Sequence, residues 1–119
     1  MRVASLASAI FAASVAVASA QELGGNYRVS GTNFDGSRYS GTAEIVFTSN
    51  TSCRINWVTG STTSRGICMR NGGSFAASYR LGNSVGLVVY EINADGSMEG
   101  TWTIADKSGY GTERLTPAR

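Results

Sequence analysis

The segment from Ser84 to Ile104 holds two runs of β-forming residues on either side of the turn sequence Asn93-Ala94-Asp95-Gly96. Glycine adopts positive φ without steric cost, so Asp-Gly between two such runs is a strong signal for a β-hairpin. A type I turn with Gly96 at the left-handed bulge position pairs Ile92 with Met98. That register places every apolar side chain of the strand 97–104 on one face, and a one-residue slip would mix the faces. The segment therefore predicts an antiparallel hairpin with one buried face.

Similar alternation and similar turns recur along the chain from residue 25 onwards. The predicted strands lie at 25–32, 38–48, 53–58, between Ser61 and Asn71, and at 74–81, 84–92, 97–104 and 110–116. Such a meander of short-linked strands closes naturally into an up-and-down barrel, which leaves no exposed sheet edge. We therefore expect an all-β fold, a small eight-stranded antiparallel barrel of calycin-like shape. A two-sheet β-sandwich is the alternative.

Residues 1–20 have the composition of a secretory signal peptide. Met1-Arg2 supplies a positive start, an Ala-rich apolar stretch follows, and Ala18-Ser19-Ala20 matches the small-residue cleavage pattern. We expect residues 21–119 to form a single β-barrel domain. The leader indicates export through the general secretory route, to the periplasm or the extracellular space.

The chain has two cysteines, Cys53 and Cys68. In an exported chain the default interpretation of such a pair is a structural disulfide. A hairpin turn at Gly60-Ser61 places the two residues directly opposite each other on neighbouring strands. Their spacing is unlike the C-x-x-C motif of redox enzymes, so we predict a structural disulfide between them.

The ten Lys and Arg residues are nearly balanced by eight Asp and Glu residues. Proteins that bind nucleic acids normally carry a strong basic excess, so nucleic acid is not an expected partner. The predicted outer face of the barrel carries many arginines. A lipid-facing surface tolerates few charges, so we do not expect a membrane-spanning barrel.

Histidine is absent, which removes the commonest general base and the commonest metal ligand. The Asn-x-Asp-Gly-Ser segments at 33–37 and 93–97 resemble parts of Ca²⁺ loops. Each needs only hairpin geometry, however, and the Glu that closes an EF-hand loop is missing. We expect no metal, no cofactor and no enzymatic activity, unless a carboxylate such as Glu113 serves as a base.

Alternation along the predicted strands sends aromatic side chains and one carboxylate into the barrel. Aromatic faces with one carboxylate suit a small, flat, partly polar ligand. The candidate ligand-binding residues are Trp57, Tyr90, Trp102 and Glu113. The alternative is a filled core, in which the carboxylate is hydrogen-bonded to a tyrosine hydroxyl or paired with an arginine.

The position of the last strand depends on the loop before it. If the loop has the four residues Asp106–Gly109, residues 111, 113 and 115 point inward beside residues 104, 102 and 100. In the other registers, Tyr39 and Tyr79 each face a glycine, as does Tyr90. A ring laid over a glycine fills the space of a second side chain. These pairs therefore determine whether the interior of the barrel is filled or contains a cavity.

A second group of apolar residues points outward on three consecutive predicted strands. We single out Ile67, Leu87 and Val89 as a candidate interface. A contiguous apolar outer surface suggests a protein partner or self-association. The alternative is that the inner and outer faces are exchanged in this part of the chain.

The segments Gly86-Leu-Val-Val-Tyr-Glu91, Asp95-Gly96, Gly100-Thr-Trp-Thr103, Gly111-Thr-Glu113 and Leu115-Thr-Pro117 carry a resemblance. Together they resemble a family of small exported bacterial proteins of uncharacterised function. The resemblance covers the C-terminal third best and implies no activity. The overall plan is also similar to the avidin and lipocalin barrels, in shape only.

These observations lead to two hypotheses of function. The first is an exported barrel that binds a small ligand. The second is a structural or interaction protein of the cell envelope, with a filled barrel and an outer apolar interface. A cavity inside the barrel distinguishes the two.

Overall fold

The computed structural model describes residues 23–118, so the predicted signal peptide lies outside the described residues. The strands are β1 (Gly25–Thr32), β2 (Arg38–Phe47), β3 (Cys53–Thr59), β4 (Thr62–Asn71), β5 (Ser74–Leu81), β6 (Ser84–Ile92), β7 (Met98–Ile104) and β8 (Gly111–Pro117). Residues 23–118 contain no helix of the length and hydropathy that a membrane crossing requires.

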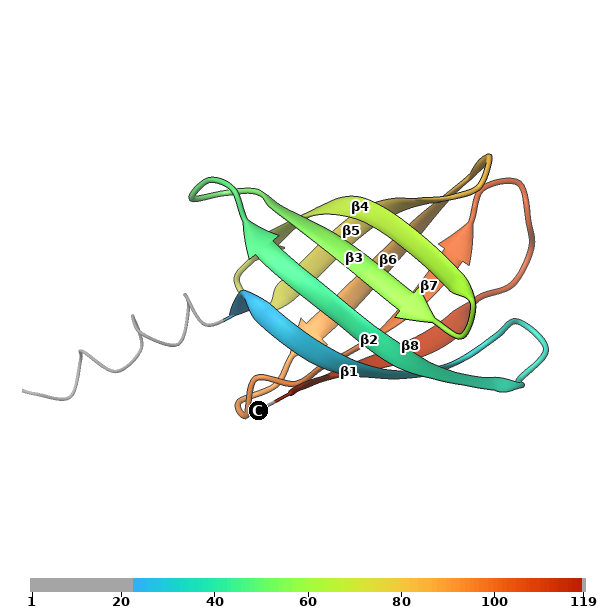
Figure 1. The fold of residues 1–119 in the computed structure, drawn as a ribbon, viewed down its shortest axis with the longest axis horizontal. Helices are drawn as coiled ribbons and strands as arrows, with labels where there is room; N and C mark the ends of the chain where they lie inside the picture. The colour runs from blue at the N-terminus through green and yellow to red at the C-terminus, as the bar shows by residue number, and fades with distance from the viewer. Residues whose placement is uncertain (1–22, 119) are drawn as a thin grey trace, which may run out of the picture.

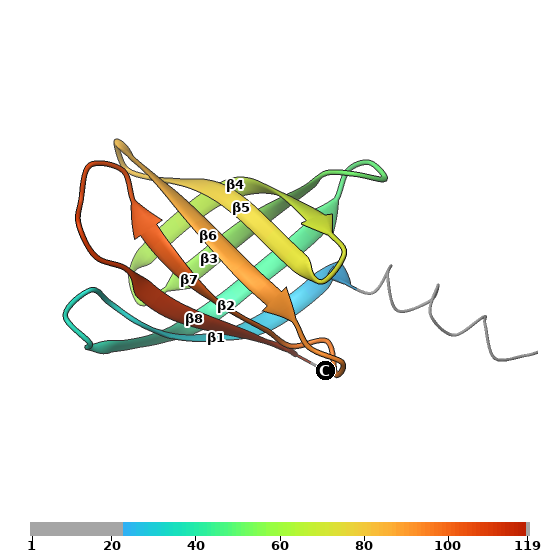
Figure 2. The same cartoon turned by 180° about the vertical axis from the view of Figure 1, so that it is seen from behind.

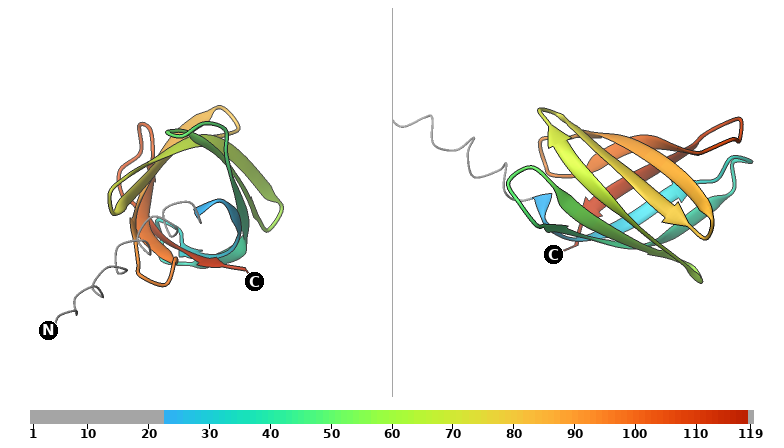
Figure 3. Two further views of the ribbon diagram at one scale, coloured as in Figure 1. Left: turned by 90° about the vertical axis from the view of Figure 1, so that its left-hand side faces the viewer. Right: turned by 90° about the horizontal axis from the view of Figure 1, so that it is seen from above.

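Each strand pairs antiparallel with the next, and β8 returns to pair with β1 (Figure 1, Figure 2). The closing ladder places Val29 opposite Leu115 and Gly31 opposite Glu113. A view along the axis shows a ring of tilted strands (Figure 3, left). The predicted up-and-down barrel is therefore confirmed, and the two-sheet sandwich is excluded.

Turn chemistry explains most of the strand registers. Gly36 and Gly96 both have φ of 88°, the left-handed bulge conformation that the Asp-Gly turns require. In the second of these turns, the Asp95 carboxylate accepts hydrogen bonds from the backbone N–H and the hydroxyl of Ser97. The same contacts join Asp35 to Ser37. These carboxylates therefore hold the two hairpin turns in shape.

The register of β8 differs from the prediction by two residues. The structure pairs Trp102 with Gly111 and Gly100 with Glu113, whereas a four-residue loop would have paired Trp102 with Glu113. The loop is longer, because the Ala105 N–H still bonds to Val85 and the Thr103 hydroxyl donates to the Gly109 carbonyl. The predicted faces of β8 are nevertheless correct, since the shift is an even number of residues.

One end of the barrel is the end where β1 begins and β8 ends (Figure 1), and its interior is filled by side chains. Side chains from every part of the chain are buried there; they include Leu23, Tyr27, Ile45, Phe75, Met98 and Leu115. The Tyr27 hydroxyl donates a 2.7 Å hydrogen bond to the Leu23 carbonyl, which seals the same end. We call this the packed end.

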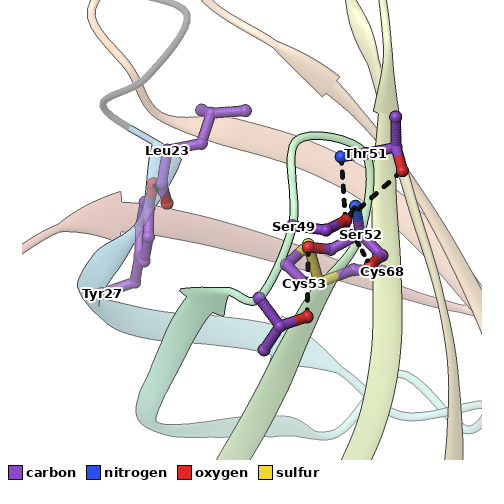
Figure 4. Close-up of a disulfide and its surroundings, with 8 residues drawn as sticks. Leu23, Tyr27, Ser49, Thr51, Ser52, Cys53 and Cys68 are labelled. Carbon is purple, nitrogen blue, oxygen red and sulfur yellow. Dashed lines mark hydrogen bonds between the residues drawn. A yellow bond between two sulfur atoms is a disulfide. The ribbon is translucent and has the colours of Figure 1, made fainter.

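The predicted disulfide is present and lies at the packed end (Figure 4). Cys53 of β3 and Cys68 of β4 are directly opposite, with Cα atoms 5.0 Å apart. The turn before Cys53 is tied by the Ser49 hydroxyl, which accepts hydrogen bonds from the N–H groups of Thr51 and Ser52. By the chain-entropy model, a loop of this length contributes about 3 kcal/mol of stability.

Several glycines lie where two strands approach too closely for a side chain. A Cβ added to Gly66 would come within 2.0 Å of the Ser78 carbonyl oxygen on β5. A Cβ at Gly41 or Gly100 would meet the backbone of its neighbouring strand in the same way. Such glycines let strands bend sharply, which a small barrel needs in order to close.

Candidate ligand-binding site

The end of the barrel opposite the packed end is hollow. A partly open cavity of about 290 Å³ lies there, beneath the turns that follow β1, β3 and β5. Its wall is formed by Asn33, Tyr39, Trp57, Thr59, Thr62, Ser64, Tyr79, Leu81, Val88, Trp102 and Glu113. The mouth is thus mainly polar and the deeper wall is mainly aromatic.

Glu113 is the acidic group of the cavity wall. It comes from β8, where alternation turns Gly111, Glu113 and Leu115 inward, and its exposed fraction is 8%. Its Oε1 accepts a 2.6 Å hydrogen bond from the Tyr39 hydroxyl. Its Oε2 accepts from the Trp57 indole N–H at 2.9 Å and from the Tyr90 hydroxyl at 2.5 Å. Strands β2, β3 and β6 therefore all supply a donor to one carboxyl group.

Two effects compete for the protonation state of Glu113. Burial is the larger effect and raises the pKa of its carboxyl above the ordinary value of 4.5. The three hydrogen bonds favour the ionised form and lower that pKa. No Lys or Arg belongs to the cavity wall, so the charge has only neutral donors as neighbours there.

The tyrosines around Glu113 stay protonated. Burial, and then the negative charge of Glu113, raises the pKa of Tyr79 to about 12. The same causes raise the pKa values of Tyr39 and Tyr90 further above their ordinary value of 10.0. These hydroxyls therefore remain hydrogen-bond donors at any physiological pH.

Ring atoms of three aromatic residues occupy the space that a side chain would fill if the glycine on the adjacent strand had one. The Tyr79 ring covers Gly86, the Tyr39 ring covers Gly31, and the Trp102 ring covers Gly111. The third of these pairs was not predicted. At Gly100, where a Tyr90 ring was expected, the closest atoms are backbone atoms of β6. Rings held against the wall leave the centre of the barrel open.

Two aromatic contacts frame the cavity. Trp57 and Tyr79 meet edge to face with ring centroids 5.2 Å apart. On the other side, Trp102 contacts Phe34, a residue of the β1–β2 turn, at 5.0 Å. The Trp102 indole N–H lies near the Tyr39 hydroxyl, and its proximity partly offsets the rise in the pKa of Tyr39. It has no acceptor of good geometry within the described residues, so it is a buried donor without a partner.

The predicted site residues fall into two groups. Trp57, Trp102 and Glu113 all lie on the cavity wall. Tyr90 does not: it is fully buried below the cavity and reaches the site through its hydroxyl, which holds Glu113. Strand alternation did not single out the residues at the mouth of the cavity, such as Asn33 and Thr62, which lie at or just beyond strand ends.

The candidate interface residues lie on the outside of the barrel. Ile67, Leu87 and Val89 are 61%, 58% and 55% exposed, on strands β4 and β6. Ile67 and Leu87 both pair with Ser78 of β5, so they flank one residue on the same outer row. The inner and outer faces are therefore as predicted in this part of the chain.

The Glu113 charge leads to a prediction about pH. We expect the wild type to gain stability relative to Glu113→Gln as the pH falls from neutral toward 4.5. An acid whose pKa is higher in the folded chain takes up its proton more readily when folded, so acidification favours folding until the unfolded chain also protonates. Urea unfolding of both proteins across this range measures the difference. A difference that grows as the pH rises would contradict this assignment.

Residues 23–118 contain no group of three or more Cys, Asp or Glu side chains placed to hold a metal ion. No protein-family model and no curated protein sequence matches the chain. The resemblance to small exported bacterial proteins therefore stays a prediction.

Solved structures show clear similarity in fold. The redesigned β-barrel b11L5F_LGL has a TM-score of 0.71 and 16% identity, over 82% of this chain and 92% of that one. The redesigned barrel mFAP1, bound to DFHBI, has a TM-score of 0.69 and 20% identity, over 82% and 96%. The REP1-NXSQ fatty acid transporter has a TM-score of 0.54 and 14% identity, over 82% and 97%. At these identities the likeness concerns the fold, a closed antiparallel barrel.

Proposed function

We propose that this protein binds a small ligand inside the hollow end of its barrel. One observation carries the proposal: a cavity of about 290 Å³ with aromatic walls and one buried carboxylate opens at one end only. Concave sites with mainly apolar walls and a few convergent polar groups are typical of ligand-binding sites. A filled barrel, which the interaction hypothesis expected, does not have this space.

Each part of the site has a role in this proposal. Trp57 and Trp102 offer flat faces for stacking, and Glu113 accepts a hydrogen bond from the ligand. Trp102 also offers an indole N–H that has no acceptor among the described residues. A ligand oxygen or nitrogen placed near it would satisfy that donor.

Two further findings support the proposal. The structural neighbours include a barrel solved with DFHBI and a protein described as a fatty acid transporter, so this fold accommodates small molecules in other proteins. The disulfide indicates an oxidising compartment. We therefore propose a location in the periplasm or the extracellular space, as the predicted signal peptide at residues 1–20 suggests.

A substitution that fills the cavity tests the proposal. Ser64 lies on the cavity wall, so we expect Ser64→Phe to abolish binding while the barrel stays folded. Thr63→Phe is the matched control, because Thr63 is the preceding residue of β4 and faces solvent. Saturation-transfer NMR with aromatic fragments of positive, negative and zero charge measures binding to all three proteins.

The expected result is a set of fragments that bind the wild type and Thr63→Phe but not Ser64→Phe. Native mass spectrometry of protein purified from its own host should show the same dependence for any retained molecule. If no fragment distinguishes Ser64→Phe from the wild type, the cavity is not a binding site.

A further inference from the structure

We infer that the ligand of the cavity is an organic cation, such as an alkylated ammonium or a protonated aromatic amine. The inference rests on the proposed function. Among the residues of the cavity wall, Glu113 is the one that carries a charge. Its hydrogen-bond partners, Tyr39, Trp57 and Tyr90, are all neutral donors. These donors hold the carboxyl group in place and bring no positive charge to it.

Glu113 also keeps capacity for one more partner. A carboxylate has room for about four hydrogen bonds. Its Oε2 accepts two hydrogen bonds and its Oε1 accepts one from protein groups. Oε1 can therefore accept a hydrogen bond from a ligand N–H, or it can lie against the positive charge of a quaternary ammonium group.

The walls favour the same class of ligand. Faces of Trp and Tyr attract cations through the ring quadrupole, and this attraction grows when the cation is removed from water. Tyr39, Trp57, Tyr79 and Trp102 all line the cavity, together with Glu113. Aromatic faces around one carboxylate are a suitable environment for a cation with an apolar body.

Other ligand classes fit the site less well. A fatty acid or another carboxylate would place a second negative charge beside Glu113, in a site with no Lys or Arg on its wall. A neutral ligand would cover the Glu113 carboxyl group without offering it a positive charge. The likeness to a fatty acid transporter concerns the fold and carries no such ligand to this chain.

A matched set of probes tests the charge. Benzyltrimethylammonium is the cation, neopentylbenzene is its uncharged isostere, and phenylacetate is an aromatic anion. We expect the cation to bind at least about tenfold more tightly than the isostere, and phenylacetate not to bind. Chemical-shift titration of the wild-type protein measures all three.

Variants of two glutamates show which charge is responsible. Glu113→Gln should weaken cation binding by about tenfold or more and leave the isostere unchanged. Glu44→Gln is the control, since Glu44 is an exposed residue of β2 and its loss changes net charge equally. Equal binding of cation and isostere would overturn the inference and leave the proposed function intact. If Ser64→Phe abolishes the binding of none of the probes, both this inference and the proposed function are wrong.

We also propose that the outer face of β4, β5 and β6 joins a second copy of this chain. Cross-strand pairing arranges this face in rows. Arg65 pairs with Arg80 at one end, and Glu91 pairs with Glu99 at the other. Like charges directly opposite each other destabilise a sheet. Glu99 forms an ion pair with Arg114 of β8, so the charged groups left for an external partner are Arg65, Arg80 and Glu91.

Two apolar rows lie between these charged rows. They contain Ile67 and Leu87 in the first, and Met69 and Val89 in the second, with exposed fractions of 52% to 61%. An in-plane two-fold axis between the apolar rows brings the end of the face that carries Arg80 in one copy over the end that carries Glu91 in the other. A shallow groove among Arg54, Arg65 and Arg80 is available to receive the acidic side chains.

Charge exchange tests this arrangement by sedimentation of the protein over a range of concentrations. Arg80→Glu and Glu91→Arg should each weaken the dimer by about tenfold or more, and the double variant should restore it. Leu87→Asp should give a monomer, whereas Val46→Asp, at a valine of β2 that is 47% exposed, should not. A wild type that stays monomeric at millimolar concentration, or a double variant no better than the singles, overturns the proposal.

Discussion

Glu113→Leu is expected to lower the free energy of unfolding by about 3–5 kcal/mol, because three hydrogen-bond donors lose their acceptor. The leucine removes the acceptor for the Trp57 indole N–H and for the Tyr39 and Tyr90 hydroxyls. Donors that lose their partner while buried carry the full cost of desolvation. Tyr90 is completely buried, so water cannot replace the carboxylate there without rearrangement.

The control for this prediction is Glu113→Gln, which keeps an acceptor oxygen for Trp57 and Tyr90. Its amide group can donate to the Tyr39 hydroxyl, so we expect a loss of no more than about 1–2 kcal/mol. Guanidinium unfolding at neutral pH compares the three proteins. A leucine variant as stable as the glutamine variant would show that the hydrogen-bond network contributes little to stability.

Gly66→Ala is expected to cost at least about 3 kcal/mol, although it adds one methyl group to a sheet. The added Cβ would lie 2.0 Å from the Ser78 carbonyl oxygen and 2.9 Å from the Tyr79 Cα. Both are backbone atoms, so no change of rotamer relieves the contact. Relief requires β4 and β5 to separate, which a closed ring of strands resists.

Gly73→Ala provides the comparison. Gly73 lies in the β4–β5 turn, has no positive φ, and a Cβ there would have no atom within 4 Å. We expect a change of less than about 1 kcal/mol in either direction. Thermal unfolding of both variants, followed by circular dichroism, measures the contrast. Equal effects of the two substitutions would mean that strand bending at Gly66 is not a requirement of the barrel.

The sequence predicted registers where turn chemistry is explicit. The Asp-Gly turns and the Gly-first turn at Gly60 fix the pairing of their strands, because each admits one positive-φ position. The loop before β8 has no such signature. Its length is associated with the hydrogen bond from the Thr103 hydroxyl to the Gly109 carbonyl, which forms only once the barrel has folded. The register of β8 therefore could not be derived from the sequence.

The sequence predicted which site residues point into the barrel, but it did not predict their positions along the barrel axis. Alternation shows that Trp57, Tyr90 and Glu113 point inward, which the structure bears out for all three. It does not show how far along the barrel axis each one lies, because this depends on the stagger of every strand around the ring. Alternation therefore does not distinguish Tyr90, which lies below the cavity, from Trp57, which lines it. Phe34 was missed for a related reason, since turn residues have no inner or outer face in a strand pattern.

The closing ladder between β1 and β8 also has a consequence for how the molecule can be connected to others. It brings the two ends of the described chain side by side, where the Ala118 N–H donates to the Asn26 carbonyl. Both ends leave from the packed end (Figure 1), on the far side of the molecule from the mouth. A reporter or tether fused at either terminus therefore leaves access to the interior unobstructed. A short linker between the ends would make the chain circular, and it could then be reopened at Gly82-Asn83 to carry new termini beside the mouth.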